Sequence, residues 1–194
     1  MTQSKQQLKQ KSLVLDTLKA HMYCMQCAAP LVATLLDHEW RAACSSNDCE
    51  FVFWNNPTPV VAVLVEHLDE HGGSHGFVLA HNVLWQHPHY SVITGFLEAD
   101  DESTVLSAQR ETLEELNLHA VRHHYIGNYS NTSTNQLIIA YHVQAVGELK
   151  LNHELDDFKY IPLETMSGWS SETGQAVGDF VIQHTQGQVH YIEY

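Results

Sequence analysis

The sequence predicts a mixed α/β protein of the α+β class, and three observations support this prediction. A continuous β-branched and apolar run, Val60–Val65, is typical of a strand that is buried on both faces. Residues 103–116 place apolar side chains at helical spacing. With 194 residues, of which 44% are hydrophobic and 16% charged, the chain can fill a core. This composition excludes global disorder.

Residues 1–20 are expected to form a helical segment that packs one apolar stripe, including Leu15 and Leu18, against a neighbour. The segment lacks the uninterrupted apolar run and the small-residue cleavage site of a secretory signal. No later stretch approaches the ~20 consecutive apolar residues that a membrane span needs. We therefore expect a soluble, cytoplasmic protein without a membrane partner.

Residues 21–56 are expected to form a small zinc-ribbon-like module, because all four cysteines lie there in two close pairs. Cys24 and Cys27 have the spacing of a zinc knuckle, and Cys44 and Cys49 form a wider second pair. In a reducing compartment, this arrangement favours one tetrahedral four-thiolate Zn²⁺ site over two disulfides. Such a site is structural, since four thiolates leave no position for water or substrate. The alternatives are ordinary buried thiols or a site that has lost its metal.

A domain boundary is expected near residues 55–59, where two prolines follow the cysteine-containing segment, so that residues 57–194 form the second domain. Gly72 and Gly73 indicate the turn of a hairpin after the first strand. Further strands are expected at Phe77–His81, Tyr90–Leu97, Tyr125–Tyr129, Leu137–Val146, Phe158–Ile161 and Val189–Ile192, and helices at Ser103–Leu116 and Glu172–His184. The histidines near the hairpin, His67, His71 and His75, are interpreted as exposed side chains, and the alternative is contact with zinc or phosphate.

The acidic composition argues against a nucleic-acid partner. The formal net charge is −14, and a surface this negative repels phosphate backbones. Between Cys24 and Cys49 the only Lys or Arg is Arg41, so the ribbon has no basic patch. Small phosphorylated ligands stay possible if a cation lies between them and the carboxylates.

The helix expected at residues 103–116 carries three glutamates on one side. Glu111, Glu114 and Glu115 are three or four residues apart, so their side chains share a face opposite the apolar one. Like charges at these spacings destabilise an isolated helix by a few tenths of a kcal/mol, and Arg110 is the one close counter-charge. A hard divalent cation such as Mg²⁺ would relieve the repulsion, because Mg²⁺ prefers carboxylate oxygens and is often shared with substrate phosphates. The alternative is a solvated acidic face.

The wider pattern closely resembles the Nudix box of the Nudix hydrolase superfamily, Gly-x5-Glu-x7-Arg-Glu-U-x-Glu-Glu-x-Gly-U, where U is aliphatic. The matching residues are Gly95, Glu102, Arg110, Glu111, Glu114 and Glu115. The gap from Gly95 to Glu102 is one residue too long, unless Asp101 takes the place of the glutamate. Thr112 stands at an aliphatic position. Asn117 replaces the second glycine, and asparagine tolerates a left-handed helix end better than other non-glycine residues.

This resemblance implies an α/β/α sandwich with a mixed sheet and a metal-dependent pyrophosphohydrolase. It implies that Mg²⁺ or Mn²⁺ binds Glu111, Glu114, Glu115 and the backbone carbonyl near Gly95. Glu102 and Arg110 would form a structural pair.

The catalytic candidates are Glu114, Glu115 and, as a general base from a later loop, Glu154. Asp156 and Asp157, in the same segment before the strand expected at Phe158–Ile161, are further candidates for this base. In the family such a base often comes from the helix or from a later loop. The alternative for Glu154 is a place in an exposed acidic turn.

The cysteine-rich segment before Asn56-Pro57-Thr58-Pro59-Val60 is similar to the ribbon-bearing Nudix enzymes, which include the NADH pyrophosphatases. Those pyrophosphatases carry Ser-Gln-Pro-Trp-Pro-Phe shortly after the box, whereas this chain has Tyr129-Ser-Asn-Thr-Ser-Thr-Asn-Gln136. ADP-ribose or a similar dinucleotide or nucleotide sugar is therefore favoured over NADH. The resemblance also favours a homodimer. The alternative is a non-catalytic, nucleotide-sensing Nudix module.

Overall fold

The computed structural model describes residues 5–193, so the first four residues of the expected N-terminal helical segment and residue 194 lie outside it. The chain divides into two compact units, Met1–Asn56 and Pro57–Tyr194. The five Lys and Arg of residues 1–56 balance the five Asp and Glu there, so the second unit carries the whole net charge. Within the described range, every helix is too short or too polar to cross a membrane.

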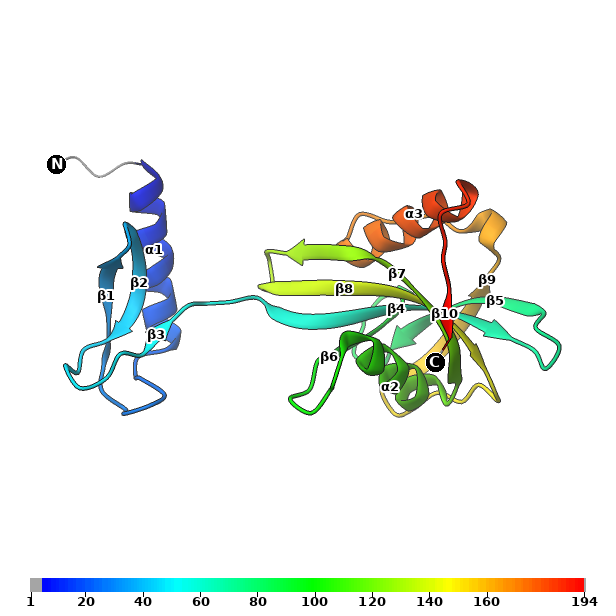
Figure 1. Ribbon diagram of the computed structural model, residues 1–194, viewed down its shortest axis with the longest axis horizontal. Coiled ribbons are helices and arrows are strands. Elements are labelled where there is room, and N and C mark those ends of the chain that lie inside the picture. The colour runs from blue at the N-terminus through cyan, green and yellow to red at the C-terminus, as the bar shows by residue number, and fades with distance from the viewer. Residues whose placement is uncertain (1–4, 194) are drawn as a thin grey trace. The chain divides into compact units, whose positions relative to one another are not determined.

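The first unit consists of one helix against a three-stranded antiparallel sheet (Figure 1). The helix is α1 (Lys5–Ala20), and the strands are β1 (Leu31–Leu36), β2 (Glu39–Cys44) and β3 (Val52–Phe53). Among the side chains that the structure describes, its core cluster has three buried members, those of Cys24, Leu31 and Ala42, with partly buried apolar side chains packed against them. Small units of this kind commonly rely on a disulfide or a bound metal in addition to their apolar core.

The second unit is built on a seven-stranded mixed sheet with the order β10-β7-β8-β4-β5-β9, in which β6 also pairs with β4. Only the β4–β8 pair is parallel among the described strands; the other pairs are antiparallel. The strands are β4 (Thr58–Leu68), β5 (Ser74–Asn82), β6 (Ile93–Phe96), β7 (His119–Asn131), β8 (Gln136–Val146), β9 (Leu155–Ile161) and β10 (Ile192–Glu193).

Two helices cover opposite faces of this sheet (Figure 1). Val61, Val63 and Val65 of β4 pack in one core cluster with α2 (Thr104–Leu116). The alternate residues Ala62 and Leu64 pack in a second cluster with α3 (Glu172–Thr185). Burial on both faces explains why this strand has no polar alternation. A 3₁₀ turn, Leu163–Thr165, precedes α3. The predicted mixed α+β fold and α/β/α sandwich are confirmed.

Some expectations differ from the structure. The final strand, expected at Val189–Ile192, is β10, which covers Ile192–Glu193 alone. The strand expected at Tyr125–Tyr129 is β7, which extends over His119–Asn131 because it pairs with β8 along almost its whole length. His67 is buried rather than exposed. Its Nδ1 lies 2.6 Å from the Tyr160 hydroxyl and its Nε2 lies 2.9 Å from the Gly147 carbonyl. These hydrogen bonds satisfy both ring nitrogens inside the fold.

Candidate active site

Helix α2 is held by caps at both ends. The Ser103 hydroxyl accepts a hydrogen bond from the Leu106 N–H (3.3 Å), and Asn117 adopts a left-handed conformation (φ 57°) in which its N–H donates to the Leu113 carbonyl (2.9 Å). Thr112, at the usually aliphatic position, is fully buried, and its hydroxyl donates to the Ala108 carbonyl (2.7 Å). The threonine therefore fills the apolar site without leaving a polar group unpaired.

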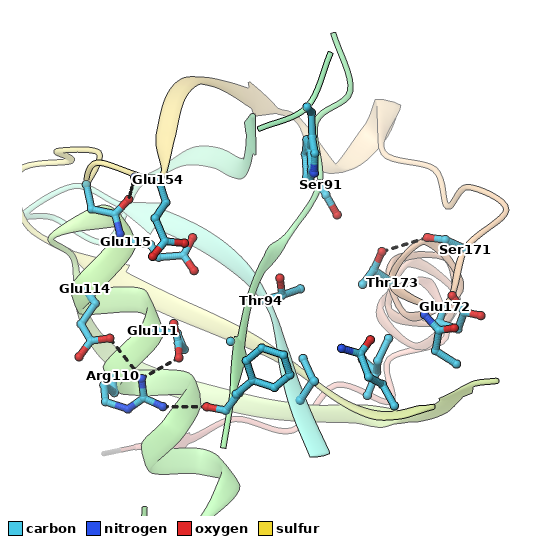
Figure 2. A pocket seen from close by; sticks show the side chains of 18 of the residues that line it. Ser91, Thr94, Arg110, Glu111, Glu114, Glu115, Glu154, Ser171, Glu172 and Thr173 are labelled. Atoms are coloured by element: carbon cyan, nitrogen blue, oxygen red, sulfur yellow. Dashed lines mark hydrogen bonds and ion pairs between the residues drawn. The ribbon is translucent and has the colours of Figure 1, made fainter. Parts of the chain in front are cut away.

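The glutamates of α2 line one side of a cavity of about 580 Å³, and the N-terminal residues of α3 line the other side (Figure 2). The carboxylates around it belong to Glu98, Glu111, Glu114, Glu115, Glu154 and Glu172. Across the cavity, Ser171 and Thr173 contribute hydroxyl groups. Sequence reasoning missed these two residues, since the one local signal was a serine preceding a predicted helix.

Arg110 organises the acidic side of the cavity. Its Nε and Nη2 donate to Asp101 (3.3 and 3.0 Å), Nη2 also donates to the Phe96 carbonyl (3.0 Å), and Nη1 donates to Glu111 (2.6 Å) and Glu114 (3.1 Å). All five guanidinium donors therefore have acceptors within the protein. No other Lys or Arg lines the cavity in the described part of the chain. An anionic ligand thus finds no uncommitted guanidinium or ammonium group there.

The expected pair of Glu102 with Arg110 is wrong, because Asp101 takes that place. Asp101 also accepts hydrogen bonds from the Ser107 hydroxyl (2.6 Å) and the Glu98 N–H (2.8 Å). The Arg110 guanidinium and these donors hold the pKa of Asp101 well below its usual range. Five residues separate Gly95 from Asp101, which is the gap that the box has between its glycine and its first glutamate. The extra residue of this chain therefore lies after Asp101, and Glu102 is exposed.

Replacing Asp101 by asparagine is expected to lower kcat by about tenfold, because Arg110 would then hold Glu111 and Glu114 less firmly. The matched variant Glu102→Gln is expected to behave like the wild type. Steady-state hydrolysis rates of the two variants test this assignment. The opposite ranking of the two would restore Glu102 as the partner of Arg110.

Gly95 lies on β6 opposite Val61 of β4, where the Glu111 carboxyl group rests against its bare Cα. A Cβ atom on residue 95 would overlap the Glu111 carboxyl group. The glycine is therefore required by this close approach rather than by a turn. The same contact brings the Gly95 backbone and the Glu111 side chain together, as the sequence pattern predicts for a shared site.

Gly95→Ala is expected to lower kcat by about 10²-fold by displacing Glu111, and to reduce stability by about 1–3 kcal/mol through overpacking. Gly178→Ala is the control, because a Cβ on that α3 glycine would come no nearer than 3.8 Å to other atoms. Activity assays and urea unfolding of both variants provide the measurement. Wild-type activity in Gly95→Ala would contradict the role of this contact.

Burial and mutual repulsion affect the glutamates unequally. Glu111 and Glu115 are each 8% exposed, whereas the side chain of Glu114 is 56% exposed. Burial, with the negative charges of Glu111, Glu154 and Glu114, raises the pKa of Glu115 to about 8. Burial also raises the pKa of Glu111, against the opposing effect of Arg110. Among the described residues, no donor or cation pairs with the Glu115 carboxylate.

These carboxylates suit a hard divalent cation. They supply oxygen ligands, and one of them is buried without a counter-charge while the nearby guanidinium is fully occupied. The glutamate oxygens are more widely spaced than the ligands of a closed protein site, since only the four cysteines bring one ligand atom each within 4.8 Å of one another in the described range. An open arrangement of this kind fits ions that also keep waters and bind substrate phosphates.

Glu154 is the one residue of the acidic turn that the structure brings to the cavity. Its side chain lies beside that of Glu115, and both line the cavity (Figure 2). Asp156 instead pairs with His81 (2.6 Å between Oδ1 and Nδ1), and Asp157 accepts a hydrogen bond from the Tyr90 hydroxyl. The structure therefore separates three acids that the sequence could not rank.

In the N-terminal unit, the four cysteine Sγ atoms lie within 4.8 Å of one another. The separation is 3.7 Å between Cys24 and Cys49 and 3.4 Å between Cys27 and Cys44. A tetrahedral Zn²⁺ with Zn–S bonds of about 2.3 Å requires sulfur atoms about 3.8 Å apart. Two backbone N–H groups donate to the Cys24 and Cys44 Sγ atoms (3.3 and 3.4 Å), as in zinc knuckles. The cluster is therefore compatible with the predicted zinc site.

Comparisons with known proteins agree with this geometry. A sequence profile of the NUDIX domain matches residues 57–180. The fold is similar to a NUDIX hydrolase from Nitrosomonas europaea, with a TM-score of 0.67 and 18% identity over 86% of this chain and 93% of that one. It is also similar to the E. coli ORF135 protein, with a TM-score of 0.50 and 17% identity over 67% of this chain and 94% of that one. No curated protein matches the sequence.

Proposed function

This chain belongs to the NUDIX family of pyrophosphohydrolases, and from that premise we propose that it hydrolyses the pyrophosphate bond of a nucleoside diphosphate linked to another moiety. The proposed substrate is ADP-ribose or a similar dinucleotide or nucleotide sugar rather than NADH. The preference rests on residues 129–136, which lack the motif of the NADH pyrophosphatases. A cavity of about 580 Å³ lies within the usual range for small-molecule sites.

The observation that carries the proposal is the buried, unpaired Glu115 beside the fully occupied Arg110. In the proposed site, Glu111, Glu114, Glu115 and the Gly95 carbonyl hold Mg²⁺ or Mn²⁺. Such an ion supplies the positive charge that a pyrophosphate needs near this acidic wall and makes water more acidic. Arg110 keeps Glu111 and Glu114 oriented, and does not contact the phosphates because its donors are already used.

We assign Glu154 the role of general base. In this role its carboxylate would accept the proton of the water that attacks phosphorus, while the bond from that phosphorus to the bridging oxygen breaks and the second phosphate group leaves. Glu115 beside it would help to hold the cation, which would supply positive charge to the leaving phosphate. The position of Glu154 on the loop before β9, facing the α2 glutamates, supports the assignment.

A substrate panel tests the proposed function. Purified protein would be incubated with ADP-ribose, NADH, dinucleoside polyphosphates and nucleoside triphosphates, each with Mg²⁺, with Mn²⁺ and with EDTA. We expect metal-dependent release of a nucleoside monophosphate from ADP-ribose or a related compound at a higher kcat/KM than from NADH. Binding without turnover of any compound would instead establish the nucleotide-sensing module.

Metal binding is expected to become tighter as pH rises. Because the Glu115 carboxyl holds its proton up to about pH 8 in the metal-free protein, a cation must displace that proton below this pH. The apparent Mn²⁺ affinity should therefore rise by up to about tenfold for each pH unit from pH 6 to 8 and level off above. Calorimetric titrations at several pH values measure this, and Glu115→Gln should flatten the profile. A wild-type affinity independent of pH from 6 to 8 would contradict it.

We also propose that Cys24, Cys27, Cys44 and Cys49 bind one structural Zn²⁺ and that the protein works as a cytoplasmic homodimer without a nucleic-acid partner. The thiolate geometry supports the zinc site. The net charge of −14 supports the exclusion of nucleic acid.

A further inference from the structure

We propose that Asn117 is a positioning residue, whose side-chain amide anchors the segment of residues 147–154 and so places Glu154 beside Glu115. The inference rests on the proposed function, in which Glu154 acts as the base. It assigns a task to the residue that replaces the second glycine of the box.

The anchored segment connects β8 to β9 and runs along the C-terminal end of α2. The Asn117 Nδ2 donates to the Glu148 carbonyl (3.0 Å). Two further residues of the same segment are hydrogen-bonded to the helix, because the Lys150 and Asn152 N–H groups donate to α2 carbonyls. Their acceptors are the carbonyls of residues 116 (2.9 Å) and 115 (3.1 Å), which would otherwise be unpaired at a helix end. The side chain of residue 117 is the first of these three attachments.

The fastening continues to Glu154. The Asn152 side-chain oxygen accepts a hydrogen bond from the Glu154 N–H (2.9 Å), and the Glu154 carbonyl accepts one from the Val83 N–H (2.9 Å). Between the hydrogen bonds at Glu148 and Asn152, the side chains of Leu149 and Leu151 pack against the core cluster on the α2 side of the sheet. The N–H and the carbonyl of Glu154 are thus both hydrogen-bonded. The position of Glu154 also depends on the start of the segment, which the Asn117 side chain holds at Glu148.

The amide, rather than the backbone conformation, is what asparagine adds at this position. A glycine would adopt φ 57° more easily than asparagine, and its N–H would still donate to the Leu113 carbonyl. Only the bond from Nδ2 to the Glu148 carbonyl would be lost. Asn117→Gly therefore separates the anchor from the helix cap, and Asn117→Asp removes the donor while keeping the side-chain shape.

The experiment compares these two variants with the wild type in the metal-free and Mg²⁺-loaded full-length protein. We expect wild-type thermal stability for Asn117→Gly, faster amide hydrogen exchange confined to residues 147–154 without metal, and about tenfold lower kcat/KM with metal. Asn117→Asp should show the same exchange change. The control is Asp37→Gly, at another residue with positive φ (47°) that lies exposed in the turn between β1 and β2, and it should match the wild type in both measurements.

Combining Asn117→Gly with Glu154→Gln tests whether the anchor acts through Glu154. The double variant should lose no more activity than Glu154→Gln alone, because the anchor has nothing left to position. Unchanged exchange in 147–154, exchange that rises across the whole domain, or additive losses would each overturn the inference. Lack of turnover by the wild type would refute the proposed function instead, and the exchange data would still decide whether the anchor exists.

Discussion

Replacing Glu115 by glutamine is expected to lower kcat by on the order of 10³-fold, because the amide has nearly the shape of the carboxyl group but cannot carry the negative charge that holds a divalent cation. Glu115 is the most strongly perturbed carboxyl group of the cavity, with a pKa of about 8. Rates measured with saturating Mg²⁺ and a substrate identified by the panel give the comparison. An unimpaired variant would refute the catalytic assignment.

The same substitution should make the metal-free protein more stable at high pH. The folded-state pKa of Glu115 lies above the value of about 4.3 expected in the unfolded chain. The folded state therefore keeps a proton that the unfolded state releases, and this group makes the free energy of unfolding fall as pH rises from about 4.5 to about 8. Glu115→Gln removes that decline.

Thermal unfolding at pH 6 and pH 9, without added Mg²⁺ or Mn²⁺ and without a chelator, measures the difference. The wild type should lose more stability than Glu115→Gln between these pH values. Glu114→Gln is the matched comparison, since the half-exposed Glu114 pairs with Arg110 and its loss gives no such gain. If the stability of Glu115→Gln fell with pH as that of the wild type does, the repulsion inferred around Glu115 would be contradicted.

Removing the zinc site is expected to unfold the N-terminal unit while leaving the NUDIX unit folded. The described part of the N-terminal unit has a small core cluster, whereas a structural Zn²⁺ contributes about 10–16 kcal/mol of apparent binding free energy at pH 7. Cys24→Ser removes the most buried thiolate. We expect the variant to lose its zinc and to be cut by proteases within residues 21–56, with the fragment from about residue 57 onward resistant.

Zinc analysis and limited proteolysis with mass spectrometry provide the measurement. Ser45→Ala is the control, because Ser45 lies in the same ribbon and is exposed beside the ligand Cys44. It should retain one zinc per chain and wild-type resistance. Zinc near zero in the wild type, or equal resistance in Cys24→Ser, would contradict the four-thiolate site.

The strong local patterns of the sequence predicted the fold well. The Val60–Val65 run became β4, whose alternate residues face α2 and α3, because burial on both faces leaves a direct apolar signature. Helical spacing likewise placed the glutamates on one side of α2. The structure places these carboxylates and Gly95 around one cavity, whereas their role as metal ligands stays a prediction.

Features that depend on distant partners could not be predicted in this way. The sequence alone left both Asp101 and Glu102 possible as the partner of Arg110. The position of the Arg110 guanidinium in the fold makes Asp101 the partner. His67 is buried because Tyr160 and the Gly147 carbonyl, far along the chain, complete its hydrogen bonds. Glu154 was distinguished from Asp156 only by the strand pairing that turns one toward the cavity and the other toward His81.

The confinement of the net charge to the NUDIX unit also governs how fast substrate arrives. A polyphosphate approaching a domain of charge −14 is repelled at distances up to the Debye length, about 8 Å at physiological ionic strength. Encounter is thus opposed at long range, the reverse of electrostatic steering. Dissolved salt and Mg²⁺ that already neutralise the substrate in solution would both speed its capture. Under the proposed function, free Mg²⁺ would therefore act on the association rate constant as well as at the proposed metal site.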